Sequence, residues 1–268
     1  MEAFVNGIRM SYDDTGAGDP VLLIHGFPLC RRMWHPQLHK LSIAGYRVIA
    51  PDLRGFGESD APDGPYSMDL FADDTVALLD HLGIDRAVIG GMSMGGYVLF
   101  NLLERYPERI LGALFITTRA TPDDDAAKAR RLELATALRI HGPQVVADPF
   151  VSLLFAPGAE RERPKLVEEV YRWMVANVSR GLAGGLLAMR ERKDYTPLLG
   201  TFRVPALAIG AELDQAAPPA TSTVIAAGIP GCRLSIIPGA GHLANLEDVK
   251  AFTNEVKEFL ANVYPARS

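Results

Sequence analysis

Short apolar runs bounded by turn residues recur along the chain, first between residues 21 and 116 and again between 204 and 237. Runs of this kind are typical of strands that are buried on both faces of a parallel sheet. They predict strands at 21–24, 46–50, 86–89, 110–116, 204–210 and 233–237. Residues 4–12 contain the turn pair Asn6-Gly7, which predicts a hairpin ahead of these strands.

Between the predicted strands, apolar residues recur at the three- and four-residue spacing of a helix that buries one face. The segments with this helical character are 34–42, 68–82, 97–104, 217–227 and 246–263. Strands that alternate with helices form βαβ units, and such units build a parallel sheet with helices on both faces. The sequence therefore predicts an α/β protein with a mostly parallel, doubly wound sheet.

The alternation of strands and helices stops between residues 119 and 199. The pattern there is helical throughout, over 124–140, 144–154, 164–178 and 179–191, with proline and glycine marking the breaks. We expect residues 1–118 and 200–268 to form the α/β core. Residues 119–199 are expected to form a helical cap, or lid, inserted after the sixth strand.

Gly91, Ser93 and Gly95 match the pattern G-x-S-x-G of a nucleophile elbow. Five residues alone are a weak signal, because glycine and serine are common in turns. The predicted strand before Ser93 and the predicted helix after it supply the context that the motif requires. They favour a serine whose hydroxyl points out of the sheet at the positive end of the helix.

A serine nucleophile needs a base and a third group that orients the base. Only His141 and His242 follow Ser93, and His242 lies in a glycine-rich loop after the last predicted strand, where chemistry collects in open α/β sheets. We predict His242 as the base, the alternative being a solvent-exposed loop histidine. Asp214, just after the strand at 204–210, is predicted as the acid, and Glu212 is its competitor.

The oxyanion hole of such a site is built from backbone N–H groups. We expect one from Met94, the residue after the nucleophile, and one from Phe27 in the loop after the strand at 21–24. His25 is expected to be structural, with its ring bonded to nearby backbone. Trp34 and Met92 are candidates, with Phe27, to line a substrate pocket, and plain core packing is the alternative for each.

Composition and charge indicate which kinds of partner, such as nucleic acid or membrane, this protein is not expected to bind. The chain has 268 residues, of which 48% are hydrophobic, so a large core is possible. Its formal net charge of −5, without a dense run of Lys or Arg, argues against a nucleic-acid partner. We find neither a secretory signal nor an apolar segment of spanning length, so we expect a cytoplasmic protein without a membrane partner.

Cys30 and Cys232 lie far apart in the sequence and belong to no metal-ligand pattern. We interpret them as free thiols, and a disulfide between them is the alternative. No cluster of Cys, His and Asp suggests a metal ion, and the proposed chemistry needs no metal or organic cofactor. The sequence does not indicate an oligomeric state.

The motifs fall in an order that resembles the α/β-hydrolase fold superfamily. They are His25-Gly26-Phe27-Pro28, residues 52–59, residues 91–96, Gly210 with Asp214, and Gly241-His242. The resemblance covers nearly the whole chain and is most similar to the esterases and 3-oxoadipate enol-lactonases. It implies the α/β-hydrolase fold and a Ser93-Asp214-His242 triad. The run Thr117–Ala120 departs from the enol-lactonase pattern, which leaves the substrate open.

The working hypothesis is a serine hydrolase that cleaves a small carboxylic ester or lactone through an acyl-enzyme intermediate. Arg119, just past the strand at 110–116, is a candidate to bind a substrate carboxylate, as an acidic lactone would require. The alternative is a surface arginine that pairs with the acidic residues 123–125.

Other functions use the same scaffold. Cofactor-free perhydrolases or haloperoxidases and carbon–carbon bond hydrolases share the triad, whereas Ser93 argues against a haloalkane dehalogenase, whose nucleophile is aspartate. A ligand receptor on a hydrolase scaffold is a further alternative, because a fold does not determine a function.

Overall fold

The computed structural model describes residues 1–264. Their strands form one eight-stranded sheet in the order β1-β2-β4-β3-β5-β6-β7-β8. The hairpin strands β1 (Glu2–Val5) and β2 (Ile8–Asp14) are antiparallel, and β2 joins β4 in antiparallel register. The other strands are parallel: β3 (Asp19–Ile24), β4 (Tyr46–Pro51), β5 (Ala87–Met92), β6 (Ile110–Ile116), β7 (Ala206–Ala211) and β8 (Arg233–Ile237). The mostly parallel sheet predicted from the apolar runs is confirmed.

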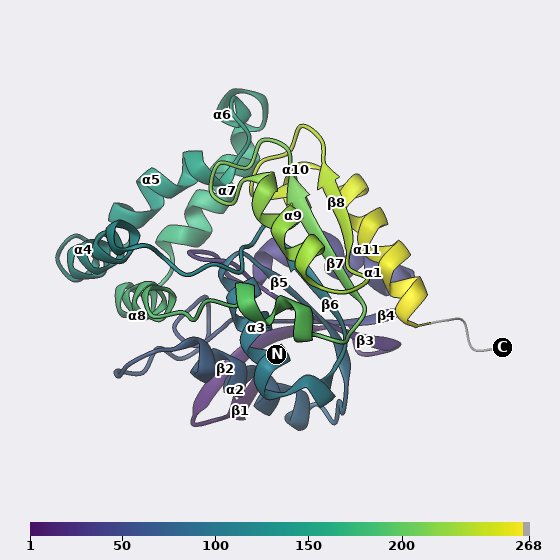
Figure 1. Ribbon diagram of the computed structural model, residues 1–268. Coiled ribbons are helices and arrows are strands. Elements are labelled where there is room, and N and C mark those ends of the chain that lie inside the picture. The colour runs from purple at the N-terminus through teal and green to yellow at the C-terminus, as the bar shows by residue number, and fades with distance from the viewer. Residues whose placement is uncertain (265–268) are drawn as a thin grey trace.

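Helices cover both faces of this sheet (Figure 1). One face carries α1 (His35–Ile43) and α11 (Val249–Val263), and the other carries α2 (Met68–His81), α3 (Met94–Arg105) and α9 (Pro219–Gly228). Neighbouring residues of one strand therefore enter opposite cores, as Val88 and Ile89 of β5 do. This double burial explains why the strands are apolar at consecutive positions.

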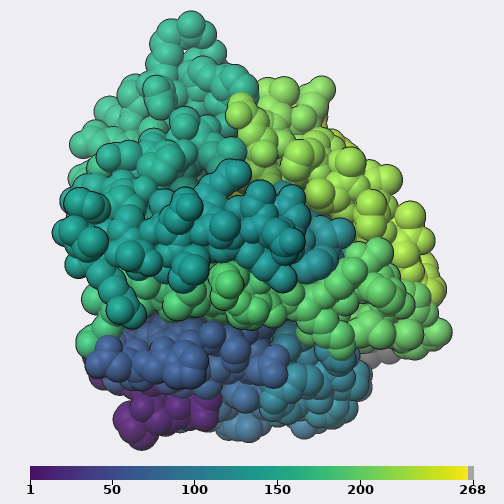
Figure 2. Space-filling model, turned by 60° about the vertical axis from the view of Figure 1, so that its left-hand side comes forward, coloured from purple at the N-terminus to yellow at the C-terminus, as the bar shows by residue number. Residues whose placement is uncertain are grey.

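A helical segment separates β6 from β7, as the sequence predicts (Figure 1). It contains α4 (Asp125–His141), α5 (Gln144–Leu154), α6 (Ala159–Glu162), α7 (Pro164–Val175) and α8 (Ser179–Arg190). We call residues 119–199 the insertion. In Figure 2 its teal helices form a continuous mass beside the yellow-green C-terminal part of the core.

Several boundaries differ from the sequence prediction. The predicted helix 246–263 is split into α10 (Ala244–Glu247) and α11, because the Asp248 side chain accepts from the Ala251 N–H at 2.9 Å and starts a new helix. The predicted helix 34–42 is preceded by a 3₁₀ turn, η1 (Arg31–Trp34), and α6 was not predicted. Further 3₁₀ turns are η2 (Pro107–Arg109) and η3 (Thr196–Thr201). None of the helices described is long and apolar enough to cross a membrane.

The parallel register aligns the carboxyl ends of the central strands. Ile24 of β3 lies beside Gly91 of β5, Met92 beside Ile116 of β6, and Ile116 beside Ile209 of β7. The loops that follow these strands therefore leave the sheet at one edge. Residues that are far apart in the sequence meet there, which is the usual location of a site in an open α/β sheet.

The turn from β5 into α3 brings the strand and the helix unusually close. Ser93 has a φ angle of 52° and a ψ angle of −113°, which is strained for a residue with a Cβ. A Cβ on Gly91 would lie 2.2 Å from the Gly95 carbonyl oxygen, and a Cβ on Gly95 would lie 2.5 Å from the Ile24 carbonyl oxygen. Only glycine fits at these two positions, because the atoms in the way belong to the backbone.

His25 ties the loop after β3 to the loop after β4. Its ring is fully buried, and its Nδ1 lies 2.9 Å from the Gly26 carbonyl oxygen, which can only accept a hydrogen bond. Its Nε2 accepts from the Leu53 N–H at 3.0 Å. Burial lowers the pKa of His25, and the ring is held as one neutral tautomer. The structural role expected from the sequence is confirmed.

We predict that Gly95→Ala destabilises the fold by about 1–3 kcal/mol, because an added methyl group would meet backbone oxygens that cannot move aside. The matched control is Gly200→Ala in η3, where the nearest atom to an added Cβ is the Gly228 carbonyl oxygen at 3.9 Å. Urea denaturation measures both changes. Equal stability of the two variants would contradict the close approach of β3, β5 and α3.

We also predict that acid destabilises the protein through His25. Its pKa lies below the ordinary value of about 6.5, so as the pH falls through that value the unfolded chain binds the proton first and the free energy of unfolding decreases. Above that pH both states are neutral and the contribution is constant. Urea denaturation at several pH values should show a shallower pH slope for His25→Gln, while the exposed control His141→Gln should keep the wild-type slope.

Candidate active site

A cavity of about 440 Å³ lies at the carboxyl edge of the sheet, between the core and the insertion. Ser93 and His242 line it from the core, together with Phe27, Tyr97 and Ala216. The insertion contributes apolar side chains from α4, α5 and α8, among them Leu134, Phe150, Leu153, Leu154, Leu186 and Met189, and also the charged residues Arg119, Asp123, Arg130, Arg131 and Arg192. The structure thus brings the predicted nucleophile and base into one largely apolar pocket.

His242 and Asp214 form a buried hydrogen-bonded pair. The imidazole Nδ1 lies 2.7 Å from Asp214 Oδ2, and the two residues are 2% and 4% exposed. The second carboxylate oxygen, Oδ1, accepts from the backbone N–H groups of Ala216 and Ala217, both at 2.8 Å. The carboxylate is therefore fixed in orientation. Because Nδ1 donates its proton to it, Nε2 of the neutral ring is left as a proton acceptor.

Glu212, the competing acid, binds a different part of the loop before His242. It is exposed, and its Oε2 accepts from the Gly239 N–H at 2.8 Å across the loop that precedes His242. Its carboxylate shapes that loop but makes no hydrogen bond to the imidazole. Of the two acids after β7, the structure brings Asp214 to His242.

Two threonines after β6 hold the backbones of Ser93 and His242. Thr118 Oγ1 donates to the Ser93 carbonyl oxygen at 2.7 Å, and Thr117 Oγ1 donates to the His242 carbonyl oxygen at 3.1 Å. Thr117 has a φ angle of 40°, a strained value for a β-branched residue. The Ser93 hydroxyl makes no hydrogen bond to any residue among 1–264. Sequence reasoning missed this pair, for which the only signal is two hydroxyl residues directly after a buried strand.

Two backbone N–H groups, those of Met94 and Phe27, have no acceptor among residues 1–264. Met94 is the first residue of α3, so its N–H has no partner within the helix. The Phe27 N–H makes no hydrogen bond to the described residues, while the next backbone N–H, that of Leu29, donates to the Gly26 carbonyl oxygen at 3.0 Å. Both groups belong to the segments that the sequence predicts for an oxyanion hole, and the Phe27 side chain lines the cavity.

Glu247 was not predicted, yet it connects the His242 loop to the insertion. Its two carboxylate oxygens accept from the Gly241 N–H at 2.7 Å and from the Ala156 N–H at 3.0 Å. Burial raises the pKa of Glu247 in spite of these two bonds. The carboxylate positions the residue before His242 relative to the end of α5.

The expected pocket residues Trp34 and Met92 do not line the cavity. Both are fully buried in the core on the α1 and α11 side, where the Trp34 ring lies 6.3 Å from the Phe252 ring. Met92 packs beneath Gly26, so close that a Cβ there would meet its sulfur at 2.5 Å. The pocket assignment of these two residues is therefore corrected to core packing, the alternative given from the sequence.

Arg119 does line the cavity, where its guanidinium donates to the Ala216 carbonyl oxygen. It does not pair with the acidic residues that follow it. The Asp123 carboxylate instead pairs with Arg131 and Arg192. The surface ion pair suggested from the sequence is not formed.

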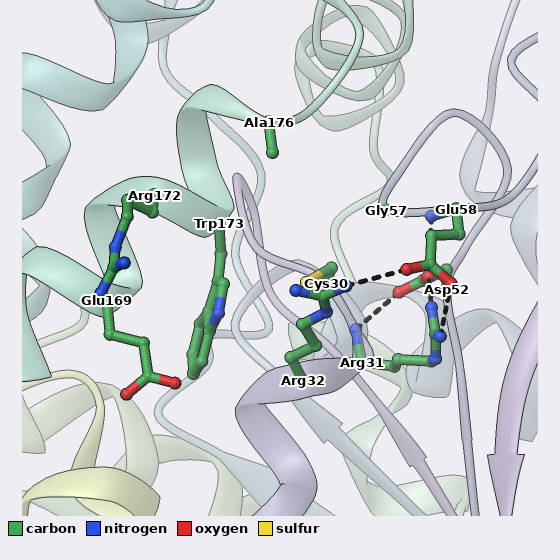
Figure 3. Close-up of a pocket in the computed structure, with 10 residues that line it drawn as sticks. All are labelled: Cys30, Arg31, Arg32, Asp52, Gly57, Glu58, Glu169, Arg172, Trp173 and Ala176. Atoms are coloured by element: carbon green, nitrogen blue, oxygen red, sulfur yellow. Dashed lines mark hydrogen bonds and ion pairs between the residues drawn. The ribbon is translucent and has the colours of Figure 1, made fainter.

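A second cavity, of about 400 Å³, lies between α7 and the loops around residues 30 and 57 (Figure 3). Opposite charges balance along its wall, which carries Arg31, Arg32, Arg172, Asp52, Glu58 and Glu169. Arg31 points toward Asp52 and Glu58 and pairs with both (Figure 3). Burial raises the pKa of the Cys30 thiol to about 12, so this cysteine is not a nucleophile at neutral pH.

Asn177 joins the insertion to the loops of this second cavity. Its Oδ1 accepts from the Gly57 N–H at 2.7 Å, and its Nδ2 donates to the Pro28 carbonyl oxygen at 2.9 Å. Neither Ser93 nor His242 lines the second cavity. Its charged wall lies between the insertion and the core, separate from the cavity that Ser93 and His242 line.

Comparison with known proteins agrees with this geometry. A family model described as the alpha/beta hydrolase fold matches residues 19–249. A thermophilic esterase from Thermogutta terrifontis, determined with malate bound, is 37% identical, with 98% of each chain covered and a TM-score of 0.94. The enol-lactonase from Burkholderia xenovorans is 30% identical over 97% of this chain and all of its own, with a TM-score of 0.91.

A bromoperoxidase from Bacillus anthracis is also similar, at 27% identity over 97% of this chain and 99% of its own, with a TM-score of 0.85. The relatives thus differ in the activities for which they are named while they share one architecture. The family match spans most of the sequence, from β3 to the start of α11. The chain therefore belongs to the α/β-hydrolase fold family, as a hydrolase similar to the esterase and enol-lactonase group.

Proposed function

We propose that this chain is a serine hydrolase that cleaves a small carboxylic ester or lactone through an acyl-enzyme intermediate. Ser93 is the nucleophile, His242 the general base and Asp214 the residue that orients the base. The observation that carries the proposal is the 2.7 Å contact between His242 and Asp214, in the wall of the cavity that Ser93 also lines. Catalytic hydrogen bonds to a serine often form only when substrate binds, so the unbonded Ser93 hydroxyl is compatible with this role.

The proposed reaction has two halves. Ser93 Oγ attacks the substrate carbonyl carbon while His242 Nε2 takes the hydroxyl proton, and the imidazolium then protonates the leaving alkoxide. Water next attacks the acyl-enzyme, His242 takes one of its protons and returns it to Ser93, and the carboxylic acid leaves. Asp214 stabilises the imidazolium in each half through its bond to Nδ1.

The N–H groups of Phe27 and Met94 are proposed to bind the oxyanion. Two observations support this role: neither group has an acceptor among the residues that the structure describes, and Met94 is the first residue of α3, whose positive end favours a developing negative charge. The Phe27 loop is tied to the insertion through Pro28 and Asn177, which restricts where its N–H can point. Donors fixed in this way need little rearrangement during the reaction.

A small substrate suits the cavity, whose volume of about 440 Å³ lies near the lower end of the range for small-molecule sites. We propose that residues 119–199 act as the cap, because α4, α5 and α8 supply the wall opposite Ser93. The likeness to an esterase and an enol-lactonase supports a carboxylic ester or lactone as the substrate class.

The likeness to a bromoperoxidase favours a second candidate function, peracid formation. The same acyl-enzyme would then be attacked by hydrogen peroxide in place of water. The two functions share Ser93, His242 and Asp214 and differ only in the second nucleophile. Comparison of peracid and acid yields with added peroxide therefore separates them.

We predict that Ser93→Ala lowers kcat on short p-nitrophenyl esters by about 10³–10⁶-fold and leaves the fold intact, because the acyl-enzyme can no longer form. Ser152→Ala, an exposed serine of α5, is the matched control and should retain wild-type kcat. An ester series from acetate to octanoate measures both variants and sizes the acyl pocket. Comparable turnover by the Ser93→Ala protein would refute the assignment of the nucleophile.

We predict that Asp214→Asn lowers kcat by about 10³–10⁴-fold, because an amide in place of the carboxylate favours the wrong imidazole tautomer and cannot stabilise the imidazolium. Glu212→Gln, which alters the competing acid of the same loop, should reduce kcat by no more than about twofold. Steady-state kinetics on one ester compare the two. The reverse ranking would assign the acid to Glu212.

A further inference from the structure

One side of the candidate active-site cavity carries a concentration of arginine. Arg119, Arg130, Arg131 and Arg192 all line it, and Asp123 is the one carboxylate among the lining residues. Three positive charges are thus in excess on the wall, and Asp214, behind His242, offsets one of them. The whole chain carries a net charge of −5, so the sign of the charge in this cavity is opposite to that of the protein.

Two of these arginines are held by Asp123. Arg192 Nη1 lies 2.7 Å from Asp123 Oδ1, and Arg131 pairs with Oδ2. Burial raises the pKa of Asp123, but its hydrogen bonds and the charges of Arg131 and Arg192 outweigh that effect and hold the pKa below the usual range of a carboxyl. The wall therefore already binds one carboxylate, between two guanidinium groups.

Arg192 is rigidly placed in this arrangement. Its side chain is 2% exposed, its guanidinium lies 4.3 Å above the Tyr97 ring, and its Nε donates to the Thr121 carbonyl oxygen at 3.2 Å. A buried arginine needs such partners, because an unpaired buried charge is costly. The pair of Arg192 and Asp123 is thus part of the architecture of the wall.

Arg119 and Arg130 pair with no carboxylate in the described part of the chain. Arg119 donates to one neutral group, the Ala216 carbonyl oxygen, which leaves the other N–H groups of its guanidinium without an acceptor among residues 1–264. Arg130, on α4, is exposed, and its side chain makes no hydrogen bond or ion pair to any described residue. Both side chains line the cavity that contains Ser93. The planar fork of a guanidinium matches a carboxylate in two-point geometry.

We propose that the substrate of this site is an ester that carries a free carboxylate on its acyl group, such as a hemiester of a short dicarboxylic acid. The proposal rests on the serine hydrolase function proposed above. Arg119 and Arg130 bind the carboxylate in the ground state and in the transition state, so they determine which ester is taken. The positive wall also attracts such an anion to a protein that otherwise repels it.

The test compares two esters of equal shape, monoethyl succinate and ethyl 4-methylpentanoate, in which an isopropyl group replaces the carboxylate. Proton release measured at about pH 7.5, where the hemiester is ionised, gives kcat/KM for each. We expect wild-type protein to favour the hemiester. The ratio of the two kcat/KM values should fall about tenfold in Arg130→Gln and in Arg119→Gln, and it should decrease when salt is raised from about 0.05 M to about 0.5 M.

Two further variants sharpen the comparison. Arg139→Gln removes a positive charge from the opposite side of the same helix, outside the cavity, and should leave the ratio unchanged. Asp123→Asn removes the carboxylate that competes for Arg131 and Arg192, and should raise the ratio. An equal fall of the ratio in Arg139→Gln and Arg130→Gln would mean that only the overall charge matters, and would overturn the proposal.

Failure of the inference and failure of the hydrolase assignment give different results. Turnover of the neutral ester that depends on Ser93, with no preference for the hemiester, overturns the anionic substrate and keeps the hydrolase. If neither ester is cleaved, calorimetry on Ser93→Ala protein compares the amide analogues succinamate and 4-methylpentanamide. Tighter binding of succinamate that is lost in Arg130→Gln supports the carboxylate site, and equal binding overturns it.

Discussion

The close approach of β5 and α3 at Ser93 is the constraint on which the candidate site depends. A strand that turns into a helix within one residue forces positive φ on Ser93, and the turn closes only because Gly91 and Gly95 carry no side chain. Thr118 then bonds the Ser93 carbonyl oxygen at 2.7 Å and holds the strained residue from the neighbouring strand end. The same turn leaves the Met94 N–H at the open end of α3. Strain at one residue thus serves both the nucleophile and the expected oxyanion donor.

The position of the base depends on contacts that cross the sheet edge. β8 follows β7 in parallel register, so the loops that carry Asp214 and His242 leave the sheet side by side. Thr117 and Glu247 then bond the backbone on either side of the imidazole. Because Glu247 also bonds the end of α5, the insertion and the base share one anchor. The Leu243 N–H also donates to the Leu154 carbonyl oxygen at 3.0 Å, so the insertion is coupled to the His242 loop through this bond as well as through the Glu247 carboxylate.

The sequence was sufficient for most of what is local or periodic, although it missed the Asp248 cap that divides the predicted helix 246–263. Strands buried on both faces appear as continuous apolar runs, and the elbow motif with a late Gly-His pair orders the candidate triad along the chain. The sequence could not predict contacts between distant segments, such as that of Thr117 with His242 or of Glu247 with Ala156. Neither Thr117 nor Glu247 belongs to a motif that would indicate its partner. Trp34 and Met92 show the converse. No sequence feature shows whether an aromatic residue or a methionine beside a motif lines a cavity or packs in the core. Trp34 and Met92 pack in the core because they lie on the side of the sheet that α1 and α11 cover.

The core and the insertion contribute different residues to the candidate site. Ser93, Asp214 and His242 all belong to loops after core strands, whereas Arg130, Arg131 and Arg192 belong to the insertion. The parallel register determines the first set, and a change there would disturb every neighbouring strand. In the second set, Arg130 and Arg131 lie on α4 and Arg192 lies just after α8, so none of the three belongs to a strand of the sheet. Relatives with one architecture and different activities are the expected result if, as proposed here, the chemistry and the choice of substrate are encoded in separate parts of the chain.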